Sequence, residues 1–82
     1  MSNLTDLPNI GKGIAAKLER IGIPTKEEFL KRDPYQVYEE LKLKLDPGLC
    51  ICALASLVGA KQGIVWHAIM EEVKAEAKKR KI

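Results

Sequence analysis

The chain has little of what catalytic and metal sites require. Its 82 residues include one histidine, His67, and no cysteine or serine nucleophile or second metal ligand accompanies it. We therefore expect His67 to be a partly buried packing residue. Consecutive glutamates diverge by about 100° on a helix and cannot converge on a substrate; they occur here as Glu27-Glu28, Glu39-Glu40 and Glu71-Glu72. The sequence predicts a non-catalytic protein without a metal ion or cofactor.

Cysteines and long apolar runs are also scarce. Cys50 and Cys52 lie two residues apart, which on a helix turns their side chains about 200° apart, unsuitable for a relaxed disulfide or a shared metal ion. We expect free, buried thiols in a cytoplasmic protein. The longest apolar run, residues 49–60, is too short to span a bilayer, and the first residues lack signal-peptide features. No membrane partner is expected.

The positive charge is concentrated at the end of the chain. The net charge is +3, but residues 71–82 hold five basic and three acidic side chains, so residues 1–70 are nearly neutral. Nucleic-acid binding would therefore have to depend on local geometry and not on bulk charge. We expect one domain over residues 1–74, followed by a charged helical tail, residues 75–82, that carries a Glu76–Arg80 pair and is dispensable for folding.

The sequence predicts an all-α fold, because apolar residues recur at helical spacing and no segment alternates as a strand would. We expect a compact domain of five or six helices with an N-terminal helix-hairpin-helix. Residues 49–60 are apolar or small on every side, which predicts a buried central helix. The other expected helices are a short one at Leu4–Leu7 capped by Ser2 or Asn3, then 12–21, a short one after Thr25, 34–44 and one from 64 onward, on which Trp66 is a core anchor.

Capping signals place several helix ends. Gly22 is expected to end the second helix, with Ile23 and Leu18 in the apolar contact of a Schellman cap. Thr25 and Glu28 have the spacing of a capping box. Asp33, followed directly by proline, is a typical N-cap of the next helix.

The candidate binding site is the turn before the second helix. Glycine is expected here where the backbone takes positive φ or lies close to another surface. The helix start would present unpaired N–H groups around Gly11, Lys12 and Gly13 to a phosphate, and Lys12 adds a mobile charge. Lys17 lies over a turn later and could reach an adjoining phosphate. The candidate nucleic-acid-binding residues are Asn9, Ile10, Gly11, Lys12, Gly13 and Lys17.

These motifs resemble known families. The stretch from Leu4 to Ile23 is similar to the helix-hairpin-helix element, which binds the DNA backbone without reading its sequence. The Gly63-Ile-Val-Trp66 signature, after a helix rich in small residues, resembles the end of the C-terminal domain of the TfoX/Sxy competence-regulator family, as do the Gly22–Thr25 and Asp33–Tyr38 stretches. This resemblance implies a stand-alone domain, without the family's N-terminal domain, that binds DNA phosphates.

One alternative from a different functional class stays open. The hairpin can be a tight connector that buries Ile10 against Leu7 and Ile14. The protein would then be an interaction module that uses the surface between the fourth and last helices to contact a protein partner or a second copy of itself.

Overall fold

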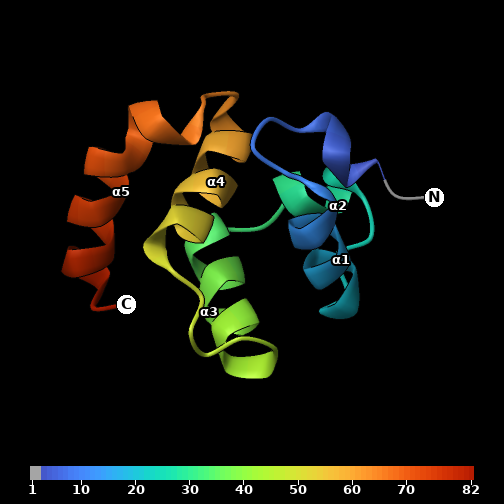
Figure 1. The fold of residues 1–82 in the computed structure, drawn as a ribbon, viewed down its shortest axis with the longest axis horizontal. Helices are drawn as coiled ribbons and strands as arrows, with labels where there is room; N and C mark the ends of the chain where they lie inside the picture. Colours follow the sequence, from blue (N-terminus) through green and yellow to red (C-terminus); the bar gives the residue numbers. More distant parts are fainter. Residues whose placement is uncertain (1–2) are drawn as a thin grey trace.

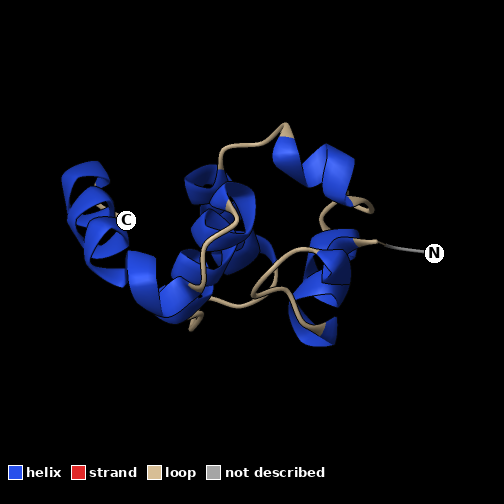
Figure 2. Ribbon diagram, turned by 90° about the horizontal axis from the view of Figure 1, so that it is seen from above, coloured by secondary structure: helices blue, strands red, loops and turns tan. Residues whose placement is uncertain are grey.

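The computed structural model describes residues 3–82, and every regular element in this part of the chain is helical (Figures 1 and 2). The all-α prediction is confirmed. A short 3-10 helix precedes five α-helices. The elements are η1 (Leu4–Asp6), α1 (Lys12–Arg20), α2 (Lys26–Leu30), α3 (Pro34–Lys44), α4 (Ile51–Gln62) and α5 (Trp66–Arg80).

Helix α4 is the centre of the fold, with α5 on one side and the N-terminal elements on the other (Figure 1). Every residue from Leu54 to Ala60 is buried. Large side chains of the other elements complete the core around it, because their apolar faces have no other surface to cover. These are Leu4, Leu18, Phe29, Val37, Leu41 and Val73. The prediction of a buried central helix is confirmed for this part of α4.

The first turn of α4 differs from the prediction. Cys50 and Cys52 are free, as expected, but both are exposed. The helix begins at Ile51, and Cys50 is its N-cap with an extended backbone (φ −83°, ψ 166°). Only Cys52 is therefore part of the helix, and the expected angle of about 200° between the two side chains does not apply. The prediction of buried thiols is wrong, because the enclosed part of the helix starts only at Leu54.

Asn3 joins η1 to α2 and does not cap η1 with its side chain. Its Oδ1 accepts a hydrogen bond from the backbone N–H of Lys26 at 2.7 Å, and its Nδ2 donates to Glu27 at 3.1 Å. This second bond contributes most to holding the pKa of Glu27 below its ordinary value. Ser2, the other predicted cap, lies outside the described residues.

The predicted caps at Gly22, Thr25 and Asp33 are present, although among residues 3–82 the second bond of the capping box, from the Thr25 N–H to the Glu28 side chain, is not formed. Gly22 has φ +88°, and the N–H groups of Ile23 and Gly22 donate to the carbonyls of Leu18 and Glu19, the two bonds of a Schellman cap. Thr25 Oγ1 accepts from Glu28 N at 3.2 Å. Asp33 Oδ1 accepts from Tyr35 N at 3.0 Å.

The charged tail packs onto the body. Ala77 is buried, and Ile82 packs against the core after its N–H returns to the carbonyl of Ala77. The guanidinium of Arg80 contacts Asp33 at 3.0 Å and lies over the ring of Tyr35. The expected Glu76–Arg80 pair is present at 2.6 Å. The end of α5 is therefore packed and not a solvated tail, whereas its dispensability for folding and the domain boundary at residue 74 stay predictions.

Asp33 and Arg80 join the start of α3 to the end of α5. Burial by itself would raise the pKa of Asp33, but hydrogen bonds from Arg80 and the Tyr35 N–H outweigh it, and this pKa lies below its ordinary value. The two acidic partners raise the pKa of Arg80. The charged pair is therefore favoured in the folded state.

We expect Arg80→Ala to lower the melting temperature more than Lys78→Ala, because Lys78 is exposed on the same helical turn and has no ion-pair partner in residues 3–82. Because the pKa of Asp33 is lower in the folded state, its ion pair contributes fully to the free energy of unfolding above the unfolded pKa of about 3.9. This contribution is lost as the pH falls from that value through the folded-state pKa. In thermal melts from pH 7 to pH 2, the difference in melting temperature between wild type and Arg80→Ala should become smaller in acid. A difference independent of pH would contradict this account.

No single helix in residues 3–82 is long and apolar enough to cross a membrane. Among these residues, only α4 and α5 taken together are, and a bend of 111° separates them.

Candidate nucleic-acid interface

The turn between η1 and α1 is made by an asparagine. Asn9 has φ +69°, a left-handed conformation that asparagine tolerates better than most residues with a side chain. Neither Gly11 nor Gly13 has a positive φ: Gly11 is extended (φ −91°, ψ −179°) and Gly13 lies within α1. The sequence predicts glycine in this turn for positive φ or for close approach to another surface, and neither reason holds at Gly11 or Gly13: Asn9 makes the reversal, and a Cβ on either glycine would meet nothing within 4 Å.

The Asn9 side chain fastens the turn to the connection between α4 and α5. Its Nδ2 donates to the carbonyl of Ile64 at 2.8 Å, and its Oδ1 accepts from the backbone N–H of Trp66 at 3.1 Å. Trp66 is the first residue of α5, whose N-cap Val65 offers no side-chain oxygen. Asn9 therefore caps a helix 57 residues away in sequence.

Gly59 allows this contact. A Cβ built on Gly59 would collide with the carbonyl oxygen of Ile64 and lie 2.6 Å from Asn9 Nδ2. Ile64 N–H also donates to the Gly59 carbonyl at 2.8 Å, after Gly63 reverses the chain with φ +75°. Glycine at position 59 is thus required by close approach and not by backbone conformation.

The start of α1 is open to solvent. Its N-cap, Gly11, has no side chain, and within residues 3–82 no group accepts a hydrogen bond from the backbone N–H of Lys12, Gly13 or Ile14. Gly11 and Gly13 are exposed, and a Cβ on either would meet nothing within 4 Å. Free N–H groups at the positive end of a helix can bind an anion.

The two lysines predicted for this site differ in their surroundings. Lys12 is exposed and has no ion-pair partner among the described residues. Lys17 Nζ lies 3.3 Å from Asp46 Oδ2, and this half-exposed pair joins α1 to the loop before α4. Lys17 would have to leave Asp46, or share its charge with it, to contact a phosphate.

The structure separates the six predicted residues into two groups. Gly11, Lys12 and Gly13 are exposed together at the start of α1. Ile10 is buried in the core, Asn9 is bound to the α4–α5 connection, and Lys17 is paired with Asp46. The second group holds the turn in place, and the first is available to a ligand.

Sequence reasoning missed an exposed apolar stretch beside the turn. Val65 is 58% exposed, and Ile64 is also exposed. Trp66 is half-buried against the core, while His67 is exposed and stacks on the Trp66 ring with centroids 3.8 Å apart. The prediction of a partly buried His67 is wrong, because the residue lies in the first turn of α5 beyond the edge of the core. No helical periodicity could have indicated the Asn9 contact that places this stretch near the hairpin.

The described residues contain no group of three or more His, Cys, Asp or Glu side chains that could hold a metal ion. The arrangement that remains is a helix start with free N–H groups, two unobstructed glycines and one mobile lysine.

By its fold, the chain is a small all-helical domain in which a tight turn joins η1 to α1. The sequence profile of the TfoX C-terminal domain matches residues 1–80, and the chain belongs to that family. The resemblance inferred from the Gly22–Thr25 and Gly63–Trp66 motifs is confirmed.

Two relatives illustrate the relationship. The mitomycin resistance protein McrB of Streptomyces lavendulae is 36% identical over 59 residues, which are 72% of this chain and 56% of McrB. The chain thus spans little more than half of that relative. A crystal structure of an uncharacterized protein from Listeria monocytogenes superimposes with a TM-score of 0.77 and 35% identity, over 87% of this chain and 84% of the other.

The same substitution should have opposite effects at two glycines. We expect Gly59→Ala to destabilise the domain by about 1–3 kcal/mol, because the new methyl group overpacks the Asn9 and Ile64 contact. Gly13→Ala should be neutral or stabilising by up to about 1 kcal/mol, because its Cβ meets open space and alanine favours helix. Urea unfolding of both variants measures the difference. Equal free energies of unfolding would show that the close approach at Gly59 contributes nothing.

Proposed function

We propose that this protein is a non-catalytic module that binds the phosphate backbone of DNA, without sequence preference, through the start of α1. The observation that carries the proposal is the set of free backbone N–H groups at Lys12, Gly13 and Ile14 beside two glycines that leave their approach open. Membership of the TfoX C-terminal domain family supports a binding role.

The turn is well held for this task. Ile10 is buried, and the Asn9 side chain makes two hydrogen bonds to the α4–α5 connection. A phosphate would therefore meet N–H groups whose positions are set before binding, and little conformational entropy would be lost on association.

The contact would be weak. Only Lys12 adds an unpaired charge at the site, and Lys17 is shared with Asp46. Residues 1–70 are nearly neutral, so no long-range field gathers DNA at this face. The proposed site suits a module that acts beside other DNA-binding surfaces or at high local concentration.

Affinity for a short labelled duplex should fall steeply with salt. For two to four phosphates engaged, the slope of log affinity against log salt is expected to be about −2 to −4. Lys12→Glu should weaken binding to every sequence alike and make the slope shallower by about 1. Fluorescence anisotropy of duplexes of different sequence measures both quantities.

Two variants make this test sharp. Lys78→Glu changes the charge equally, but on α5, at the other end of the molecule from α1 (Figure 1), and should reduce affinity much less. Gly13→Ala should keep the fold yet weaken binding, because helical Cβ atoms tilt toward the N-terminus and the methyl group would crowd the N–H groups. Loss of affinity in Lys78→Glu equal to that in Lys12→Glu would overturn the hairpin site, and no binding of wild type to any DNA at low salt would overturn the function.

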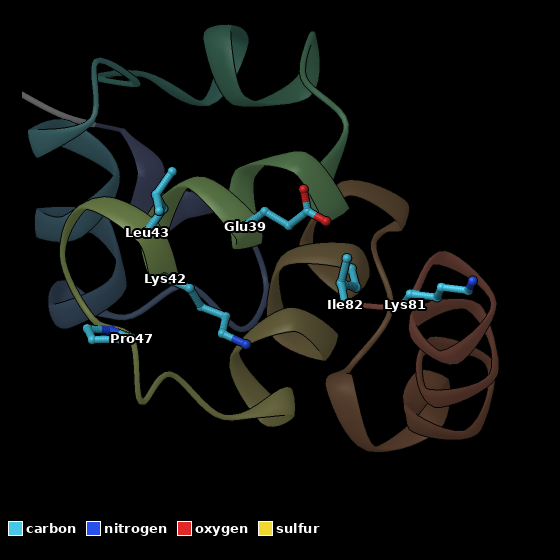
Figure 3. A pocket seen from close by; sticks show the side chains of 6 residues that line it. All are labelled: Glu39, Lys42, Leu43, Pro47, Lys81 and Ile82. Carbon is cyan, nitrogen blue, oxygen red and sulfur yellow. The ribbon is translucent and has the colours of Figure 1, made fainter.

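A specific observation also favours the second candidate, a protein-interaction module. Leu43 on α3 is 85% exposed, more than any other large apolar side chain described. It lines a groove of about 370 Å³ between α3 and the end of the chain (Figure 3). The other lining residues are Glu39, Lys42, Pro47, Lys81 and Ile82. The fourth and last helices expected from the sequence, 34–44 and the one from 64 onward, correspond to α3 and α5. The groove therefore lies on the surface that we named for the alternative function, a protein-interaction module.

If that groove joins two copies of the chain, Leu43→Ser should convert a dimer to a monomer without lowering stability, because the side chain is nearly fully exposed in one copy. Sedimentation equilibrium of wild type and variant measures the change. Identical monomers in both samples across the accessible concentration range would exclude self-association through this groove.

A further inference from the structure

The start of α4 brings two exposed thiols together. Cys50 is the N-cap and Cys52 is the second residue of the helix. Cys50 has an extended backbone and Cys52 a helical one, so the separation of about 200° between residues two apart on one helix does not apply to their side chains. Each thiol also shifts the pKa of the other. Cα atoms two residues apart near a helix start are about 5.5 Å apart, within the range that a disulfide spans.

The two thiols have unequal surroundings. The backbone N–H groups of Ala53 and Cys52, at the positive end of α4, lower the pKa of Cys50. Burial and the interaction with Cys50 raise the pKa of Cys52, and Lys74 on α5 only partly offsets them. Tyr38 also lies near Cys50: burial and Cys50 raise the pKa of Tyr38, and its hydroxyl donates to the carbonyl of Leu49 at 2.9 Å. At a given pH, Cys50 therefore carries more thiolate than Cys52 and is the better attacking thiol.

We propose that Cys50 and Cys52 form a redox-active dithiol, which low-molecular-weight disulfides oxidise to an intramolecular disulfide. The pair is exposed, so the oxidant can reach it, and it belongs to neither the hairpin nor the groove beside Leu43. This site is independent of the proposed DNA binding.

The reaction has two exchange steps. The Cys50 thiolate attacks one sulfur of the small disulfide, a mixed disulfide forms on Cys50, and the first small thiolate leaves and takes a proton from solvent. Cys52 then loses its proton to solvent and attacks the Cys50 sulfur, which releases the second small thiolate. In total the protein loses two protons and two electrons, and one small disulfide is reduced to two thiols.

Oxidised glutathione is the probe for the test. Wild-type protein, quenched in acid after incubation at pH 7.5, should show an intact mass lower by two hydrogens, with both cysteines resistant to alkylation. Trypsin should release residues 45–61 as one peptide that contains both cysteines and has the same mass loss, because no lysine or arginine lies between Leu45 and Lys61. This readout needs no variant.

Single variants assign the roles. Cys52→Ser should accumulate one glutathione adduct on Cys50, because the resolving thiol is missing. Cys50→Ser should form its adduct on Cys52 at least about threefold more slowly, because Cys52 lacks the N–H groups that favour the thiolate. Both positions are exposed, and thermal melts should confirm that each variant folds.

Three results would overturn the proposal. They are wild-type protein that keeps two stable glutathione adducts, wild-type protein that stays fully reduced, and disulfides found only between two chains. Equal adduct rates in the two variants would overturn the assignment of Cys50 as the attacking thiol.

Discussion

The position of the hairpin depends on the side-chain amide of Asn9. This one group satisfies the carbonyl of Ile64 and the first N–H of α5, and it reaches them only because Gly59 has no side chain in between. Two turns that are more than 50 residues apart in sequence are thereby fixed to each other. Without these bonds, the start of α1 would be placed by the burial of Ile10 and Leu18 and by the half-exposed Lys17–Asp46 pair. Apolar contacts and exposed ion pairs set orientation less strictly than directed hydrogen bonds do.

The sequence allowed prediction wherever the determining contact is local. The cap at Gly22 and the N-caps at Thr25 and Asp33 follow from residues within five positions of each other, and all three are present. The apolar run of α4 predicted burial because no face of it is polar. Asn9 could not be understood in this way: its conformation follows from its own type, but its hydrogen-bond partners lie on the far side of a tertiary contact.

The same distinction explains the errors. Exposure of Cys50 depends on where α4 begins, and a one-residue shift between helix and N-cap changes both the direction and the accessibility of the thiol. The small and charged residues at the end of α5 predict a solvated tail. Arg80, however, contacts Asp33 and Tyr35, which are 47 and 45 positions away in the sequence. A charged residue can thus pack against the body of the domain, which its type alone does not predict.

The starts of α1 and α4 show how a helix without an oxygen cap can be used in two ways. Neither Gly11 nor Cys50 provides a side-chain oxygen for the first N–H groups. At α4 the first N–H groups lower the pKa of the Cys50 thiol, so they act on a group of the protein itself. At α1 the glycine leaves them without a partner among residues 3–82. Exposed N–H groups are tolerated there because water solvates them. An anion that replaces this water is also stabilised by the helix dipole. The chemical difference between the two helix starts therefore comes from one side chain, a hydrogen atom at Gly11 and a thiol at Cys50.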